Sequence, residues 1–145
     1  MRKFIVICII AMLGVGQTYA QEWLTNIDEA KESAKKANQN IILVFQGSDW
    51  CAPCIKLDKE IWSNAEFQAL AADHFVMLQA DFPRRKQNKL SDELQEHNNQ
   101  LAEKYNLRGH FPLVVVLNAE GEVKGTLGYE KISPTDYYKK LTSFE

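Results

Sequence analysis

Short, continuous apolar runs predict the strands of a sheet that is buried on both faces. Residues 41–45 (IILVF) and 113–117 (LVVVL) are rich in β-branched side chains, and residues 75–78 (FVML) form a third, less regular run. The first two runs do not alternate between apolar and polar positions, which is typical of a strand covered by helices on both sides. A turn at 118–121 (NAEG) follows the second run and predicts an antiparallel hairpin with the strand after it.

Helical periodicity occupies most of the remaining sequence. It predicts helices over about 25–38 and 91–105, the second with Ser91 as its N-cap, and a last helix that begins at Ser133–Pro134. The apolar face expected for the first of these helices comprises Trp23, Ile27, Ala30, Ala34 and Ala37.

One further helix is expected between the strands at 41–45 and 75–78. Its apolar face comprises Leu57, Ile61, Ala65, Ala69 and Ala72. A strand, a helix and a second strand in so short a segment imply a parallel crossover. The predicted fold is therefore α/β, with a mixed central sheet, helices on both sides and no second domain.

Composition and charge argue against two classes of protein. The chain is 46% hydrophobic and 25% charged, so it has enough apolar surface to fold and is not expected to be disordered. Its 17 lysines and arginines are outnumbered by 19 acidic residues, so no basic excess is available for binding nucleic acid.

The N-terminus has the layout of a bacterial secretory signal peptide. Two positive charges precede an uncharged, mostly apolar stretch over 4–16, and Ala20 supplies a small residue for cleavage. The alternative is an uncleaved membrane anchor, but the stretch is shorter than the ~20 residues that span a bilayer. We therefore expect a signal peptide at 1–20 and a domain at 21–145 in the periplasm or outside the cell, without stable membrane insertion. Because Cys8 lies inside the apolar stretch, a lipid-modified cysteine at the cleavage site is not expected.

Two cysteines remain after that cleavage, in a compartment where disulfides persist. Cys51 and Cys54 lie in the segment DWCAPC, directly after the predicted strand at 41–45. Cys51 falls at a helix N-terminus, where unpaired N–H groups and the helix dipole lower a thiol pKa and favour the attacking thiolate. Cys54, one turn further along, is placed to resolve a mixed disulfide, and Pro53 stiffens the turn.

Two other roles for the cysteine pair are a metal site and a purely structural disulfide. A structural zinc site needs four ligands, whereas His74, His97 and His110 are scattered singly along the chain. A bridge that spans only two residues closes too small a loop to stabilise a fold much. The spacing therefore favours a redox pair that needs no metal and no cofactor beyond its own disulfide.

One irregular stretch at 82–90 (FPRRKQNKL) is strongly basic. It carries four positive charges between Arg84 and Lys89, in a chain that is otherwise acidic. This pattern is consistent with a solvated loop or with a docking loop for an acidic partner.

Together these segments resemble the thioredoxin superfamily, and in detail its secreted bacterial members. The resemblance rests on the strand IILVF, the motif GSDWCAPC followed by Lys56, a strand that ends at Asp81, and residues 109–112 (GHFP) before LVVVL. It implies a three-layer α/β/α sandwich and a thiol–disulfide oxidoreductase.

The resemblance also implies roles for residues around the cysteine pair. Pro112 is expected to follow a cis peptide bond and to face the pair, with Phe111 and Trp50 contributing to the substrate groove. A core aromatic is the alternative role for Phe111. Thioredoxin places a buried acid six positions before its first cysteine, behind the resolving one; here that position is Phe45.

The function expected from these features is an exported thiol–disulfide oxidoreductase that reduces disulfides of exported proteins. A membrane-borne thiol electron carrier would return it to the reduced state. The alternatives are oxidation or isomerisation of client disulfides, and a non-catalytic module that uses the same groove for binding.

The signal-peptide hypothesis predicts that the exported protein begins at Gln21. N-terminal mass analysis of protein recovered from the cell envelope or the medium tests this. A chain that still carries residue 1 would contradict it.

Overall fold

The computed structural model describes residues 21–145, and its central strand is β2 (Asn40–Gln46). The five apolar side chains of this strand are at most 1% exposed. β2 pairs in parallel with β3 (Phe75–Asp81) and antiparallel with β4 (Leu113–Leu117). The predicted signal peptide lies outside the described residues.

Two outer strands complete a mixed sheet in the order β1-β3-β2-β4-β5. β1 (Trp23–Leu24) runs parallel to β3, and β5 (Val123–Leu127) forms the predicted antiparallel hairpin with β4. Trp23, which the sequence pattern groups with the apolar face of the first helix, lies in β1 instead. Asn26 caps that helix by accepting the N–H groups of Asp28 and Glu29, so the residues before it are free to extend the sheet.

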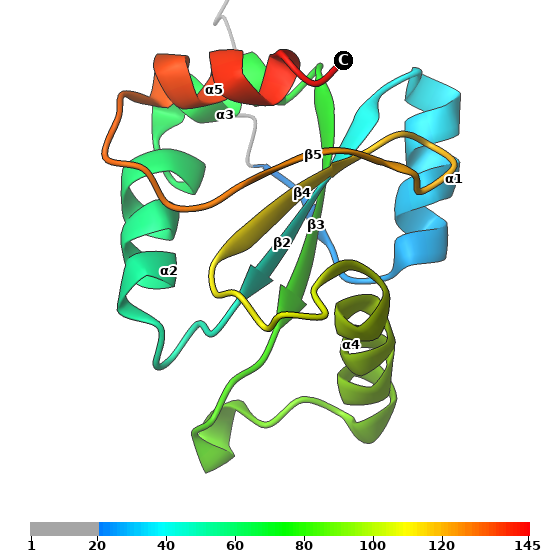
Figure 1. Ribbon diagram of the computed structural model, residues 1–145, viewed down its shortest axis with the longest axis vertical. Coiled ribbons are helices and arrows are strands. Elements are labelled where there is room, and N and C mark those ends of the chain that lie inside the picture. The colour runs from blue at the N-terminus through cyan, green and yellow to red at the C-terminus, as the bar shows by residue number, and fades with distance from the viewer. Residues whose placement is uncertain (1–20) are drawn as a thin grey trace, which may run out of the picture.

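Helices cover both faces of the sheet, as predicted (Figure 1). α1 (Ile27–Ala37) and α4 (Asp92–Tyr105) lie on one face, and α2 (Ala52–Leu57), α3 (Ala65–Ala71) and α5 (Pro134–Thr142) lie on the other. None of the helices in the described part of the chain is long and apolar enough to cross a membrane.

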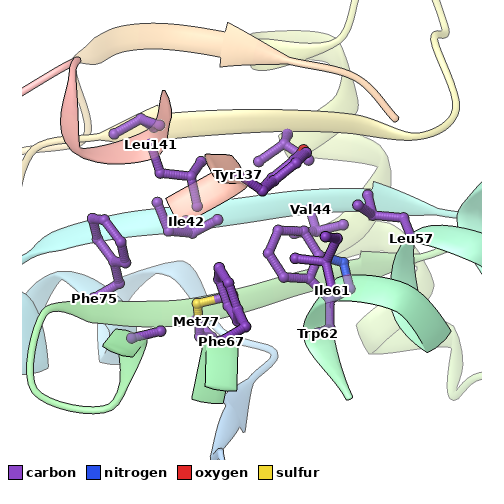
Figure 2. Close-up of a cluster of buried hydrophobic side chains, with 13 residues drawn as sticks. Ile42, Val44, Leu57, Ile61, Trp62, Phe67, Phe75, Met77, Tyr137 and Leu141 are labelled. Atoms are coloured by element: carbon purple, nitrogen blue, oxygen red, sulfur yellow. The ribbon is translucent and has the colours of Figure 1, made fainter. Parts of the chain in front are cut away.

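Alternate side chains of β2 contribute to two separate cores. On the face of α2, α3 and α5, the Trp62 ring packs edge-on against Phe67 and Tyr137, with ring centroids 5.1 and 5.6 Å apart (Figure 2). On the other face, Ala30 and Ala34 of α1 are fully buried. Because alanine side chains are short, α1 can lie close against the sheet.

The single helix expected between β2 and β3 is interrupted. α2 continues into a π-helical turn, η1 (Asp58–Trp62), and the chain then leaves helical structure. Asn64 begins α3 as its N-cap, and its side-chain oxygen accepts hydrogen bonds from the N–H groups of Glu66 and Phe67. A cap of this kind starts a new helix, so periodicity does not continue across it.

The interruption changes which residues reach the core. Leu57 and Ile61 are buried as predicted, but Ala65 and Ala69 are exposed. Phe67, which lies off the apolar face of a continuous helix, is fully buried instead.

This arrangement predicts a large loss of stability for one substitution and almost none for another, two positions away. Phe67→Ala should lower the free energy of unfolding by about 3–5 kcal/mol because it empties a packed core site. Ala69→Gln should change it by less than about 0.5 kcal/mol because the site is exposed. Urea unfolding measures both values; a loss at position 69 as large as that at position 67 would favour the continuous helix.

Candidate active site

The cysteine pair lies at the junction of β2 and α2. Gly47 follows β2, and its carbonyl accepts hydrogen bonds from the backbone N–H groups of Trp50 (3.2 Å) and Cys51 (2.9 Å). A Cβ atom at position 47 would lie 2.2 Å from the Trp50 ring, so any other residue there would displace the ring. The turn places Cys51 at the N-cap of α2.

Cys51 and Cys54 form a disulfide, with their Cα atoms 5.2 Å apart. The backbone N–H of Cys54 donates to the Sγ atom of Cys51 at 3.3 Å. A donor directed at this sulfur and the helix N-terminus both favour a thiolate at Cys51 once the disulfide is reduced. Exposure does not distinguish the two residues, which are 4% and 3% exposed, so position on the helix is what separates them.

A carboxylate ties the cysteine turn to the basic stretch at 82–90. Asp49 accepts hydrogen bonds from the backbone N–H groups of Arg84 and Arg85, both at 2.9 Å, and from the side-chain amide of Asn88 at 3.0 Å. The Arg84 and Asn88 hydrogen bonds lower the pKa of Asp49 from 3.8 to about 2. Sequence reasoning assigned Asp49 no role, since the distance along the chain hides this contact.

Trp50 and Phe111, both predicted to line a substrate groove, lie together beside the cysteine turn. Their ring centroids are 5.5 Å apart, and Phe82 lies 5.5 Å from Phe111. The indole N–H of Trp50 donates to the Phe82 carbonyl at 2.7 Å, and the Arg84 guanidinium lies 3.6 Å from the indole ring centre. The Phe111–Pro112 peptide bond is cis, as the resemblance implied.

A second carboxylate, that of Asp81, binds the cysteine turn at Ser48. It accepts hydrogen bonds from the backbone N–H of Ser48 at 2.9 Å and from the Ser48 hydroxyl at 2.5 Å. Asp81 ends β3 and is paired in register with Gln46 at the end of β2. Parallel neighbouring strands end at the same edge of a sheet, and this signal could have identified Asp81 from sequence.

A cavity of about 270 Å³ with a mixed polar and apolar lining lies beside Cys54. The side-chain amides of Gln46 and Gln79 meet across it, with Nε2 of the first 3.3 Å from Oε1 of the second. The cavity is lined by Trp23, Gln46, Ser48, Cys54, Ile55, Asp58 and Gln79. Cys54 therefore faces amides and one carboxylate rather than a purely apolar surface.

The expectation that Phe45 stands behind Cys54 is wrong. Phe45 is fully buried, but its side chain belongs to the core that β2 shares with α1 and α4, on the face opposite α2. Successive strand residues point to opposite faces, and Gln46 is the one that lines the cavity beside Cys54. Counting back from the first cysteine identified a position in the sequence but not the face of the sheet.

Within residues 21–145, no group of three or more His, Cys, Asp or Glu side chains is arranged to hold a metal ion. Two of the histidines have structural partners. His97 accepts a hydrogen bond from the Ile27 backbone N–H at 3.1 Å, and His74 pairs with the carboxylate of Glu145.

A mixed sheet between helix layers, with a disulfide-bonded Cys-x-x-Cys at the start of the helix after the central strand, defines a thiol–disulfide oxidoreductase of the thioredoxin fold. Residues 22–119 match the family model described as thioredoxin-like, and the chain belongs to this family. The predicted fold and class of enzyme are both confirmed.

Similar proteins include several that handle disulfides. The disulfide bond reductase DsbH of Chlamydia pneumoniae is 36% identical over 115 residues, which are 79% of this chain and 68% of that protein. A solved structure of DsbH oxidoreductase is 32% identical, with a TM-score of 0.79 and coverage of 88% of this chain and 86% of that one. A disulphide isomerase from Xylella fastidiosa is 26% identical, with a TM-score of 0.60 over 81% of this chain and 86% of that one.

The contacts of Asp49 predict a pH-dependent loop. Its pKa is lowered on folding, so the stabilisation that it supplies is present above about pH 4 and is lost as the pH falls toward 2. Asp49→Ala should speed hydrogen exchange at the Arg84 and Arg85 amides at neutral pH, whereas Asp73→Ala, at an exposed carboxylate elsewhere, should not. Unchanged protection of both amides in Asp49→Ala would contradict this role.

Proposed function

We propose that the protein is an exported reductase of disulfides in other exported proteins. The observation that carries the direction of the reaction is the similarity to the chlamydial disulfide bond reductase DsbH, which extends over 79% of this chain. The sequence features of a signal peptide support export.

Cys51 is the nucleophile in this proposal. Its thiolate attacks one sulfur of the client disulfide, forming a mixed disulfide and releasing the other client sulfur as a thiolate. Cys54 then loses its proton and attacks the Sγ atom of Cys51, which releases the second client sulfur. The client gains two electrons and two protons, and the enzyme is left with the Cys51–Cys54 disulfide seen in the structure.

Neighbouring groups support these two roles. The N–H of Cys54 and the N-terminus of α2 stabilise negative charge on the sulfur of Cys51. The rings of Trp50, in the cysteine turn, and Phe111 are in contact, and in this proposal they hold the client chain together with the backbone before Pro112. No metal or cofactor takes part, and a membrane-borne dithiol carrier would reduce the enzyme again.

Isomerisation is a second candidate because the Xylella fastidiosa structure, 26% identical, is a disulphide isomerase. Two measurements separate the possibilities. Acceleration of insulin reduction by dithiothreitol distinguishes an enzyme from a binding module. Equilibration with glutathione gives the reduction potential, and we expect a value more negative than about −200 mV. A value near about −180 mV would favour isomerisation, and one near about −120 mV would indicate an oxidase.

The assignment of the two cysteines makes a separate prediction. With limiting iodoacetamide, the reduced protein should be alkylated first at Cys51, because the thiolate is the reactive form. A Cys54→Ser variant should accumulate mixed disulfides with clients, and Cys51→Ser should accumulate few. Peptide mapping by mass spectrometry reads out both results, and faster labelling of Cys54 would reverse the assignment.

A further inference from the structure

The stretch at 82–90, here called the basic loop, leaves β3 and runs beside the cysteine turn (Figure 1). Its cationic side chains are all on exposed residues: Arg84, Arg85, Lys86 and Lys89. Contacts with Asp49 and Trp50 hold it against the turn that carries Cys51. The basic loop is therefore a direct neighbour of the turn that carries the redox disulfide.

The loop is anchored mainly through groups other than its cationic side chains. Asp49 accepts two backbone N–H groups and the Asn88 amide, and the Phe82 carbonyl accepts the indole N–H of Trp50. Within residues 21–145, Lys89 is the only one of the four cations in an ion pair, with Asp92 at 3.3 Å, and both side chains are largely exposed. Arg85 and Lys86 are therefore left available to a partner. The Arg84 guanidinium lies over the Trp50 ring.

The charge of the loop contrasts with that of the rest of the protein. Residues 21–145 contain 15 basic and 19 acidic residues, a net charge of 15 − 19 = −4, after the two basic residues before position 21 are subtracted. Four of those 15 cations lie within six consecutive positions that contain no acid. Carboxylates also lie around the site, where Asp49 and Asp81 bind the turn and Asp92 pairs with Lys89, so the excess of positive charge is confined to the loop itself.

We propose that the basic loop binds an acidic polypeptide segment next to the disulfide of the protein with which Cys51 exchanges. This inference rests on the proposed thiol–disulfide exchange and adds the class of its partner. The guanidinium of Arg84, 3.6 Å from the Trp50 ring centre, puts one cation directly beside the cysteine turn. Exposed charges at the edge of an interface act mainly on the association rate.

Screening limits where the acidic residues of the partner can lie. At 0.1 M ionic strength the interaction between exposed charges decays over about 10 Å. An extended chain covers that distance in about three residues. The recognised acids therefore lie within about three residues of the part of the partner chain that contacts the basic loop.

Three disulfide-linked peptides test this proposal, identical except that glutamate, glutamine or lysine flanks the disulfide. The measured quantity is the ratio of kcat/KM values between peptides for one protein, which cancels differences in intrinsic activity. We expect the protein to favour the glutamate peptide over the glutamine peptide by about tenfold at low salt, and over the lysine peptide by more. The preference should shrink toward one at about 0.5 M salt.

A double variant and a matched control locate the effect. Arg85→Gln/Lys86→Gln should lose most of the preference while keeping the backbone contacts to Asp49. Lys35→Gln/Lys36→Gln removes the same charge at the end of α1. The chain then enters β2 at the end of that strand opposite to the cysteines. This control should keep the preference.

The outcomes separate the docking proposal from the proposed function. Equal kcat/KM values for the three peptides, or an unchanged preference in Arg85→Gln/Lys86→Gln, would overturn the role of the basic loop. Either result would leave the proposed reductase activity intact. Failure to reduce any peptide would overturn both. The loop would instead bind a membrane surface if the kcat/KM values were equal and the protein bound phosphatidylserine vesicles, provided that Arg85→Gln/Lys86→Gln abolished this vesicle binding.

Discussion

Burial of β2 on both faces is the constraint on which the rest of the structure depends. A strand whose five central side chains are all apolar must be covered above and below, so helices are required on both faces of the sheet. Its two neighbours cover its edges, and the chain can leave it only at the end of the sheet. Gln46 and Gly47 mark that exit, and the cysteine pair follows directly. The redox-active cysteines therefore lie directly after the end of the buried strand.

Carboxylates position the turn that carries the cysteines. Asp81 binds the turn from the neighbouring strand, and Asp49 extends from the turn to the basic loop. In each case a charged oxygen accepts a backbone N–H, and hydrogen bonds to charged groups are stronger than those between neutral groups. The site is thus assembled by polar contacts across its rim, while the two apolar cores beneath it set the spacing of strands and helices.

Most of the architecture was predictable because burial leaves a pattern in the sequence. The strand at 113–117, the capped helix after Ser91 and the hairpin all follow from local signals that no distant contact overrides. The cysteine pair was also predictable, since its spacing and its place after a buried strand are both local. The cis bond before Pro112 was expected from the resemblance alone.

The features that sequence did not predict depend on geometry that periodicity does not record. Apolar residues continued at helical spacing through the break at Asn64, so a cap inside the pattern was hidden. The face of the sheet to which Phe45 points depends on its place in the strand, because successive side chains point to opposite faces. Counting back from Cys51 does not give that place. The contact between Asp49 and Arg84 joins residues from different loops, which local patterns cannot bring together.

Because main-chain groups anchor the basic loop, its conformation can be conserved while its charge changes. Every amino acid except proline carries the N–H that Asp49 accepts at positions 84 and 85. Side chains at these positions can therefore be exchanged through mutation while the loop keeps its place beside the cysteines. Descendants of one ancestral enzyme could then diverge in the partners that they serve while retaining the same exchange chemistry.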